Sequence, residues 1–391
     1  MSIRNNTWNL DGHYDLTKDG QNSYSDSTGP SYSVFLLGEN TYGQLGINDA
    51  SNRSSPVQLS GTTWNHIEWS KHHALGIKSN NTLWAWGQSF YGSLGQNTDG
   101  GGNIDRSSPI QIPGTQWSTA GAIHGNSSAA IKTDGTLWMW GYNNHGQLGL
   151  NDKVSYSSPT QIPGTTWDSV AAGAERIFAS KTDGTLWGWG GSGSGVLGLN
   201  DKAPRSSPTQ IGGTQWNMIG DFVSSSNYCG ENFALTKTDG TMWAWGNGSY
   251  GGVGWGNTVE YSSPIQIPGN WGYYAQGAGH WVATKTDGTL WTSGYGLQGQ
   301  IGNNTALTQG GNSPIQLPGT QWSYAKYSLA AGRQHSLAMK TDGTMWSWGK
   351  NNKGQLNTND TANRSSPVQV PGTQWSKVSS GTYINAIYIQ Q

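Results

Sequence analysis

The stretch LWMWGYNNHGQLGLND, from Leu137 to Asp152, decides the fold of this chain. Its first five residues read as a β-strand in which Trp138 and Trp140 lie on one face, because residues two positions apart share a face of a strand. A loop rich in glycine and amide side chains follows. Close copies of the whole stretch recur along the chain, so the number and spacing of the copies come first.

Three sequence markers each occur seven times. The glycine that closes the tryptophan strand recurs every 48 to 56 residues, at Gly38, Gly87, Gly141, Gly190, Gly246, Gly294 and Gly349. A Ser-Pro element follows each of these glycines. A lone tryptophan then follows a glycine-rich turn, at Trp64, Trp117, Trp167, Trp216, Trp271, Trp322 and Trp375. Three independent markers that agree on seven copies predict seven structural repeats.

Each repeat reads as four short strands, as residues 167–212 illustrate. WDSVAAG is a strand of small residues, and IFASKTDG alternates and ends at Asp183-Gly184, which favours a type I′ hairpin turn. TLWGWG is the third strand. SSPTQI is the fourth, and its early proline is typical of an edge strand. Four short strands per repeat predict the blade of a β-propeller.

The two ends of the chain complete one blade. The C-terminal WSKVSSGTYINAIYIQQ supplies two strands, and SVFLLG at Ser33–Gly38 supplies a third strand with no preceding pair. We therefore predict an all-β, seven-bladed propeller over residues 32–391, whose closure blade is shared by both termini and leaves no open edge. Residues 1–31 are expected to form an N-terminal arm, with Trp8 and Tyr14 as candidate anchoring residues.

Composition excludes several functional classes. The net charge is −1 and no basic patch is readable, which argues against a nucleic-acid partner. No apolar run approaches the length of a membrane span, and MSIRNNTWNL lacks the apolar segment of a signal peptide. The single cysteine, Cys229, excludes an internal disulfide and a cysteine-based zinc site. We predict no cofactor and no metal.

The segments LWAWGQSFYGSLGQN, LWMWGYNNHGQLGLND and AAGRQHSLAMKTDGTMWSWG resemble the regulator of chromosome condensation repeat family. The resemblance implies a seven-bladed propeller with a shared closure blade. It implies little about function, because propellers serve many tasks. The founding member exchanges nucleotide on a small GTPase through a projecting hairpin and carries a basic tail. Neither feature is readable here, since residues 1–31 hold only Arg4 and Lys18 as basic groups.

The low charge and the abundance of Gly, Asn, Ser, Thr and Trp are similar to phage-borne copies of this repeat. We therefore expect a non-enzymatic structural or recognition protein on a virion surface, as a tail fibre, tail tip or capsid decoration. Its partners would be other virion proteins or a glycan or protein of the host surface. The alternative is a cytoplasmic, protein-binding propeller that inhibits or regulates a partner, as a bacterial β-lactamase inhibitor with this repeat does.

One candidate site is the corner between the first and second strands. Polar side chains stand five residues before the second-strand lysine, at His73, Arg176, Asn232, His280 and His335, and His124 lies in the same region. Three histidines bind a metal only if they converge. Spread around a ring, they are expected instead to hydrogen-bond neighbouring loops or to form part of a ligand rim. The Asp of each TDGT segment is expected to serve its turn.

Tryptophans provide a second set of candidates. Eighteen of the 22 occupy repeat positions and are expected in the core, which leaves Trp8, Trp69, Trp255 and Trp281. Aromatic side chains on loops are frequent binding residues. In a propeller, the loops between third and fourth strands share a face with the corners between first and second strands. The candidate binding residues on that face are Tyr91, Tyr142, Asn143, His145, Tyr250, Trp255, His280, Trp281, Arg333 and His335.

Overall fold

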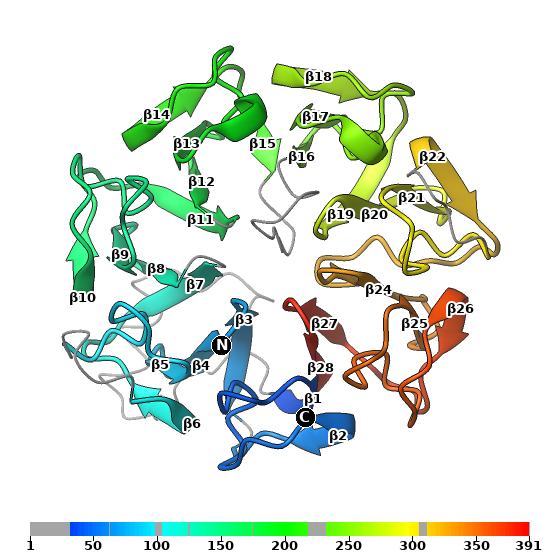
Figure 1. Cartoon of the computed structure of the whole chain (residues 1–391), viewed down its shortest axis with the longest axis horizontal. Helices are drawn as coiled ribbons and strands as arrows, with labels where there is room; N and C mark the ends of the chain where they lie inside the picture. Colours follow the sequence, from blue (N-terminus) through cyan, green and yellow to red (C-terminus); the bar gives the residue numbers. More distant parts are fainter. Residues whose placement is uncertain are drawn as a thin grey trace, which may run out of the picture.

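The computed structural model describes residues 32–390 with six internal gaps, at residues 62, 98–103, 124–125, 174, 218–231 and 305–310. The described residues form seven four-stranded antiparallel blades around a central axis (Figure 1), as predicted. The predicted N-terminal arm with Trp8 and Tyr14 lies outside the described residues, as do His124 and Cys229.

The strands follow one order in every blade, with the first strand nearest the axis (Figure 1). Blade 1 consists of β3 (Trp64–Trp69), β4 (His73–Lys78), β5 (Leu83–Gly87) and β6 (Arg106–Gln111). Blade 2 consists of β7 (Trp117–Ile123), β8 (Ser127–Lys132), β9 (Leu137–Gly141) and β10 (Tyr156–Gln161). Blade 3 consists of β11 (Trp167–Ala172), β12 (Arg176–Lys181), β13 (Leu186–Gly190) and β14 (Arg205–Ile211).

Blades 4 to 6 repeat this order. They consist of β15 (Trp216–Asn217), β16 (Asn232–Lys237), β17 (Met242–Gly246) and β18 (Tyr261–Ile267); β19 (Trp271–Gln276), β20 (His280–Lys285), β21 (Leu290–Gly294) and β22 (Gly311–Leu317); and β23 (Leu329–Ala331), β24 (His335–Met339), β25 (Met345–Gly349) and β26 (Arg364–Gln369). Two single-turn 3-10 segments lie in loops between third and fourth strands, η1 (Gly193–Gly195) and η2 (Ser249–Gly251). Within the described part of the chain, no helix is long and apolar enough to cross a membrane.

Blade 7 closes the ring with strands from both ends of the chain. It consists of β27 (Lys377–Ser380), β28 (Ile384–Gln390), β1 (Tyr32–Gly38) and β2 (Arg53–Gln58). β1 pairs with β28 along its full length, from Tyr32 opposite Gln390 to Gly38 opposite Ile384. The predicted shared closure blade is confirmed.

The hydrophobic core lies between adjacent blades. One cluster, for example, combines Leu75 and Leu83 of blade 1 with Trp117 and Trp140 of blade 2. The second strands of the repeats are buried along nearly their whole length, since both of their faces are covered. In the third strands, the first tryptophan of the pair is half-buried and the second is fully buried.

The lysine that ends each second strand is part of this packing. In six blades its Nζ lies 4.0–5.1 Å from the ring centres of both the lone tryptophan and the first third-strand tryptophan. These cation–π contacts explain why the repeat keeps a cation at this position. The lysines are Lys78, Lys132, Lys181, Lys237, Lys285 and Lys340.

The turn after that lysine differs from the predicted type I′ form. In the TDGT segment of blade 3, Gly184 has a φ of +77° whereas Asp183 is not among the residues with positive φ. The turn is therefore a three-residue loop with left-handed backbone at the glycine alone. The Asp183 carboxylate accepts hydrogen bonds from the backbone N and the hydroxyl of Thr185, at 2.9 and 2.7 Å. As expected, this aspartate serves its turn.

Candidate functional site: the rim face

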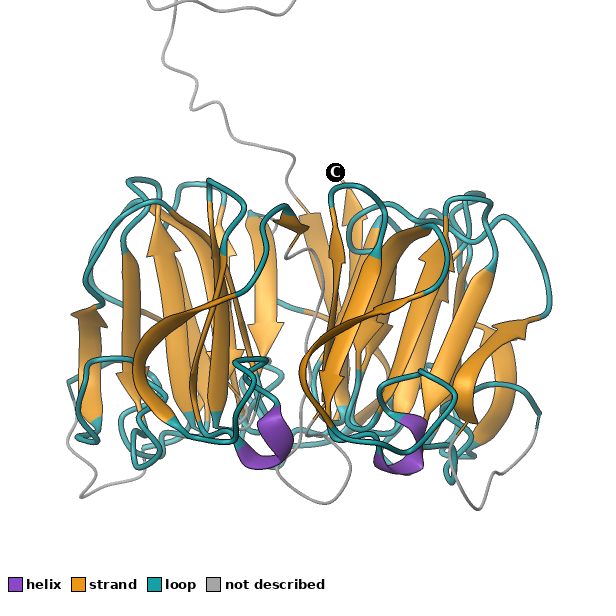
Figure 2. Ribbon diagram, turned by 90° about the horizontal axis from the view of Figure 1, so that it is seen from above, coloured by secondary structure: helices purple, strands orange, loops and turns teal. Residues whose placement is uncertain are grey.

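The two faces of the disc carry different loops. Third-to-fourth loops and first-to-second corners gather on one face, seen as the lower side in Figure 2, where η1 and η2 lie. We call it the rim face. Contacts across blades confirm that the two kinds of loop share this face, because His145 of a third-to-fourth loop lies 3.5 Å from the Glu175 carboxylate of the next blade's corner.

Exposed apolar side chains concentrate on the third-to-fourth loops. Nine large apolar side chains of the described residues are more than a third exposed, and eight of them belong to these loops: Phe90, Tyr91, Ile104, Val154, Tyr250, Trp255, Val259 and Leu297. The ninth is Tyr324. Such a distribution marks these loops as the surface on which binding energy is available.

Four side chains form a continuous aromatic strip across blades 1 and 2, which we call the aromatic sector: Phe90, Tyr91, Tyr142 and His145. The Tyr91 ring centre lies 6.1 Å from that of Phe90 and 4.6 Å from that of Tyr142, whose ring lies 6.4 Å from that of His145. Beside Tyr91 lies a hollow of about 310 Å³ lined by hydroxyl and amide groups, among them Ser158 and Asn97. Aromatic faces next to hydroxyl groups suit sugars as well as protein surfaces.

Two exposed tyrosines of the third-to-fourth loops have a left-handed backbone conformation, which costs free energy. Tyr91 and Tyr250 occupy the same loop position and have φ values of +52° and +60°. Left-handed backbone at a bulky residue costs on the order of 1 kcal/mol or more. Tyr250 packs edge-on against Tyr295 of the next blade, with ring centres 5.3 Å apart. Ser194 occupies the same loop position with a φ of +53°, so the left-handed backbone belongs to this form of the loop and not to the tyrosine side chain.

A second sector of the rim face is cationic. At the junction of blades 6 and 7, Arg333 Nη1 donates to the Tyr383 hydroxyl at 2.8 Å, and Lys350 Nζ donates to Gln334 Oε1 at 3.0 Å. Lys353 lies 3.5 Å from the Glu39 carboxylate. Partial burial, together with the charges of Arg333 and Lys353, lowers the pKa of Lys350. Arg333 is thus placed on the rim face as predicted, in an electrostatic setting that the overall charge of −1 concealed.

Trp255 lies on the outer wall of the disc rather than on the rim face itself. Its side chain is 42% exposed and borders a cleft of about 350 Å³ between blades 4 and 5. Trp291, Pro268 and Pro314 also line the cleft. The exposed position agrees with the sequence analysis, and its role in binding stays a prediction.

Trp281 is fully buried, which corrects its interpretation as a loop binding residue. It lies on β20 directly opposite Ser293 of β21, the position at which most other blades carry the second third-strand tryptophan. A Cβ placed at Gly254 would lie 2.8 Å from the Trp281 ring, just as one at Gly46 would meet Trp86. Trp281 therefore fills the space that the serine leaves empty. Trp69 is also buried, edge-on against Trp86.

The corner histidines are buried as well, so His280 and His335 do not belong to the rim. His73 and His280 each donate from Nε2 to a serine hydroxyl of the next blade at 2.9 Å, to Ser128 and Ser336. His335 Nε2 donates to Asn385 Oδ1 of the next blade at the same distance. Burial lowers the pKa of His73 and His280 to about 3 and that of His335 to about 4. These neutral histidines connect the blades.

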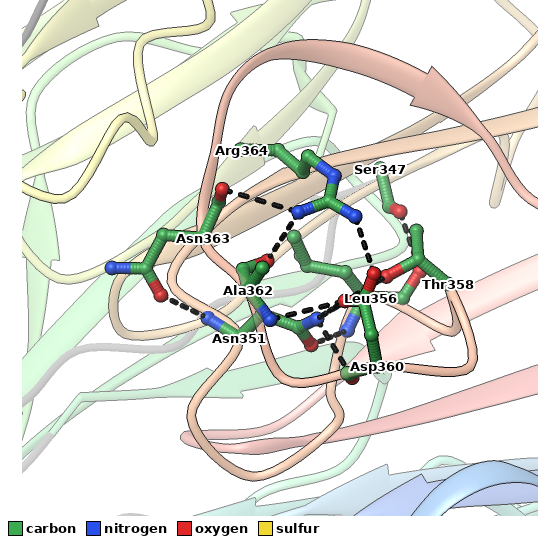
Figure 3. A network of polar contacts seen from close by, with 8 residues as sticks. All are labelled: Ser347, Asn351, Leu356, Thr358, Asp360, Ala362, Asn363 and Arg364. Carbon is green, nitrogen blue, oxygen red and sulfur yellow. Dashed lines mark hydrogen bonds and ion pairs between the residues drawn. The ribbon is translucent and has the colours of Figure 1, made fainter.

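Asn143 is a further correction, since it is fully buried inside its loop. Its Oδ1 accepts from the Leu148 backbone N at 2.8 Å, and its Nδ2 donates to Asp152 Oδ1 and Val154 O, both at 2.9 Å. Figure 3 shows the equivalent network in blade 6. There, Asn351 Oδ1 accepts from Leu356 N at 2.8 Å. The asparagine shapes the loop that carries Tyr142 and His145, whereas the loops of Tyr91 and Tyr250 have Ser89 and Gly248 at the equivalent position.

No cluster of three or more histidine, cysteine or acidic side chains within the described residues is arranged to hold a metal ion. Three aspartates of the third-to-fourth loops are instead paired with arginines four positions along the chain. The pairs are Asp49 with Arg53, Asp201 with Arg205 and Asp360 with Arg364.

The repeat unit is now defined in sequence and in space. A model of the regulator of chromosome condensation (RCC1) repeat matches residues 33–77, 134–179 and 342–388, and a second model of this repeat matches residues 327–355. The chain is an RCC1-like propeller. Each segment matched by the first model runs from the outer strands of one blade into the inner strands of the next, across blades 7 and 1, 2 and 3, and 6 and 7, so the sequence repeat is offset from the structural blade.

Curated relatives of this RCC1-like propeller have varied names. The Ultraviolet-B receptor UVR8 of Arabidopsis thaliana is 29% identical over 373 residues, which cover 88% of this chain and 69% of the receptor. The E3 ubiquitin-protein ligase HERC2 of Homo sapiens is 26% identical over 365 residues, 88% of this chain but 6% of the ligase. These relatives come from a plant and from human, so they lend no support to a phage-borne origin.

Solved structures agree on the fold alone. Human WBSCR16 superposes with a TM-score of 0.78 at 18% identity, covering 92% of this chain and 99% of that one. Prp20p of Saccharomyces cerevisiae, a protein with binding properties to Gsp1p and histones, also gives 0.78, at 19% identity with 93% of each chain covered. At such identity, function must be argued from the surface of this chain.

Proposed function

We propose that this RCC1-like propeller is a non-enzymatic recognition protein that binds a glycan or a protein through its rim face. One observation carries the proposal: eight of the nine exposed large apolar side chains among the described residues lie on the third-to-fourth loops, one of them, Trp255, at the outer wall. The engagement of His73, His280 and His335 between blades supports a role without catalysis, because these buried side chains are out of reach of a substrate.

The aromatic sector is the proposed centre of the contact. Tyr91 and Tyr142 offer ring faces, and the hollow beside Tyr91 offers hydroxyl and amide groups. Such a surface binds by stacking and neutral hydrogen bonds. Affinity should therefore change little between about 50 and 200 mM salt, where a protein that reads phosphates loses about a thousandfold or more.

The test is a screen of the immobilised protein against a glycan array and against proteins of candidate host cells. Each ligand found is then measured with Tyr91→Ala and with Tyr324→Ala, a matched control because Tyr324 is equally exposed but lies outside the third-to-fourth loops. We expect Tyr91→Ala to weaken binding at least about tenfold, the effect of a central aromatic contact. Equal binding by both variants would refute the rim face as the site.

The setting that we propose for this binding is the surface of a phage particle, which rests on composition alone. Labelling of intact particles with an antibody against the chain tests it separately from binding. Absence of the chain from particles would remove this setting and leave the rim face proposal standing.

A second candidate function is regulation of a partner protein by a cytoplasmic propeller. The names of relatives favour it: the X-linked retinitis pigmentosa GTPase regulator of Mus musculus is 30% identical over 129 residues, 31% of this chain and 12% of that protein. The cationic sector at Arg333, Lys350 and Lys353 offers such a partner an acidic contact. A protein ligand whose binding is lost in Arg333→Ala but kept in Tyr91→Ala would favour this candidate.

A further inference from the structure

The first strand of blade 6 departs from the repeat. Gly332 follows Trp322 by ten positions, whereas Gly277 follows Trp271 of blade 5 by six. The four additional residues lie in a turn between Trp322, which still bridges to Lys340, and the shortened strand β23. The turn is held by its own hydrogen bonds, including Ser328 Oγ to Ser323 O at 2.8 Å. An insertion at this place in the fold lies beside the central axis.

The turn places Tyr327 in an unfavourable backbone conformation. Its φ is +66°, a left-handed value that a tyrosine adopts at a cost of about 1 kcal/mol or more. The Tyr327 carbonyl accepts a hydrogen bond from Val378 N of blade 7 at 2.9 Å, which fixes the turn to the neighbouring inner strand. The ring then lies 5.1 Å from the ring of His66 in blade 1. Three blades thus meet around one tyrosine.

These side chains line a cavity of about 240 Å³ at the axis, on the face opposite the rim face. Lys326 and Lys377 border it together with Tyr327, His66 and Glu68. The opposite wall is formed by small and hydroxyl-bearing residues of the inner strands of blades 2 and 3, such as Thr119 and Ser169. The volume lies below the range of about 300–1,000 Å³ for drug-sized ligands, so it suits a single small molecule.

The cavity has an excess of positive charge. The Glu68 carboxylate is already engaged by His66 Nε2 at 2.5 Å. Lys326 Nζ lies 4.9 Å from the centre of the Tyr327 ring, and Lys377 Nζ lies 4.0 Å from that of Tyr32. Neither ammonium group pairs with a carboxylate among the residues that the structure describes. Two ammonium groups without an acidic partner are available to an anion.

Nine other cations among the described residues serve functions of the repeat. Six lysines cover the tryptophan pairs, and three arginines pair with loop aspartates. Lys326 and Lys377 serve neither of these repeat functions. The repeat architecture therefore does not explain their presence together at one cavity.

We propose that this cavity binds a small hydroxylated carboxylic acid of the acidic-sugar class. The ammonium groups of Lys326 and Lys377 receive the carboxylate, the Tyr327 ring packs against the apolar face of the sugar ring, and the hydroxyl groups of Thr119 and Ser169 hydrogen-bond the sugar hydroxyls. The site is independent of the rim face, because it lies on the opposite side of the disc and shares no residue with the aromatic sector.

The experiment titrates the whole protein by calorimetry with three probes: glucuronate, glucose and inorganic phosphate. We expect glucuronate to bind and glucose to bind at least about tenfold more weakly, because a hydrogen-bonded charge contributes about that much or more. Failure of glucuronate to bind at millimolar concentration overturns the proposal. Binding of phosphate as tightly as glucuronate overturns the sugar assignment and identifies a simple anion site.

Three variants localise the binding. Lys326→Gln and Lys377→Gln should each weaken glucuronate binding about tenfold to a hundredfold. Lys153→Gln, at an exposed lysine of a rim-face loop, is the matched control and should bind as the parent does. Because Lys377 also contacts Tyr32, the melting temperature of the Lys377→Gln variant is measured first. If that variant is unstable, the result with Lys326→Gln decides, because Lys326 is exposed. Glucuronate affinity equal to that of the parent in Lys326→Gln would refute the site. Tyr91→Ala should leave glucuronate affinity unchanged, because Tyr91 lies on the rim face.

Discussion

The two faces of the disc are built from the same repeats and differ in how far the repeats agree. On the face opposite the rim, five TDGT turns bear the same hydrogen bonds, with Asp Oδ1 within 2.9–3.0 Å of the threonine N. On the rim face, the residue before the loop glycine changes from blade to blade: Tyr42, Tyr91, His145, Ser194, Tyr250, Gln298 and Lys353. Hydrogen bonds fix the residues of the TDGT turns. The residue before the loop glycine is not fixed in this way, so it is free to vary and to serve recognition.

The largest loss of stability is expected from opening the ring. Both faces depend on the closed ring, so this change should affect them equally. Deletion of Thr382–Gln391 removes β28, which pairs with all seven residues of β1. We expect a loss of several kcal/mol, a large part of the stability of a typical domain, and aggregation through the freed edge. Melting temperature and size-exclusion chromatography measure this. A monomer with the parental melting temperature would contradict closure by a shared blade.

The next effect separates the interior from the loops. Trp281→Ala should cost about 3–5 kcal/mol as a large-to-small change at a buried site, equal to Trp140→Ala. Trp255→Ala, the exposed control, should cost less than about 1 kcal/mol. Adding Ser293→Trp to Trp281→Ala should restore stability, because it recreates the arrangement of Ala74 opposite Trp86 in blade 1. Denaturant unfolding decides, and no recovery in the double variant would mean that the two positions do not share one space.

This exchange shows where sequence reasoning about the repeat reached its limit. The sevenfold markers and the complementary chain ends were sufficient for the blades and their closure, because each is a property of the repeat period. Trp281 was misassigned because its burial depends on a neighbour across the sheet. The missing tryptophan at Ser293 was the available signal, and a comparison of cross-strand positions would have found it.

The candidate site was predicted in part for the same reason. Tyr91, His145 and Tyr250 are exposed on the expected face, whereas the other residues at this loop position are half-buried: Tyr42, Ser194, Gln298 and Lys353. Asn143 is buried by hydrogen bonds within its own loop, and the corner histidines, which begin the second strands, are buried by hydrogen bonds to the next blade. No periodic pattern reveals such contacts. The cluster around Tyr327 was missed altogether, although the longer spacing between Trp322 and Gly332 was visible in the sequence.

Acid should lower the free energy of unfolding through histidines in the interior rather than through residues on either face. His73, His280 and His335 are neutral when folded, with pKa values of about 3 to 4, against an unfolded value of about 6.5. The unfolded chain therefore binds more protons below pH 6.5, so stability is complete above that pH and falls as the pH drops toward 4. The expected slope is about 1.4 kcal/mol per pH unit for each histidine. Denaturant unfolding at pH 7, 6 and 5 measures it.

A matched pair of variants assigns this slope. Burial also lowers the pKa of His72 to about 4, so four histidines contribute to the slope. His280→Gln should remove about a quarter of it, whereas His145→Gln, at an exposed rim residue, should leave it unchanged. Asp183, whose pKa is lowered by its hydrogen bonds to Thr185, stabilises the fold above about pH 4 and loses that contribution only below it, outside the range measured. A flat profile between pH 6.5 and 5 would show that the buried histidines do not govern acid stability.

The smallest effect on stability should accompany the largest effect on binding. Tyr91→Asn places a residue that tolerates left-handed backbone at a φ of +52°, so we expect stability to stay level or rise by up to about 1 kcal/mol. Binding of a rim-face ligand should fall at least about tenfold, since the ring is lost. Thermal melting and affinity are measured on the same sample. Destabilisation by more than about 1 kcal/mol would show that Tyr91 belongs to the packing after all.

The shared closure blade also sets a timetable for synthesis. β1 leaves the ribosome about 350 residues before its partner β28, a delay of about 20 to 70 seconds at ordinary elongation rates. During that interval its seven mostly apolar residues have one side of their hydrogen-bonding edge vacant, which exposes the nascent chain to mispairing. In a circular permutant that begins and ends between blades 3 and 4, the four strands of every blade would be synthesised one after another. The permutant should fold with less dependence on chaperones, although its finished disc would be the same.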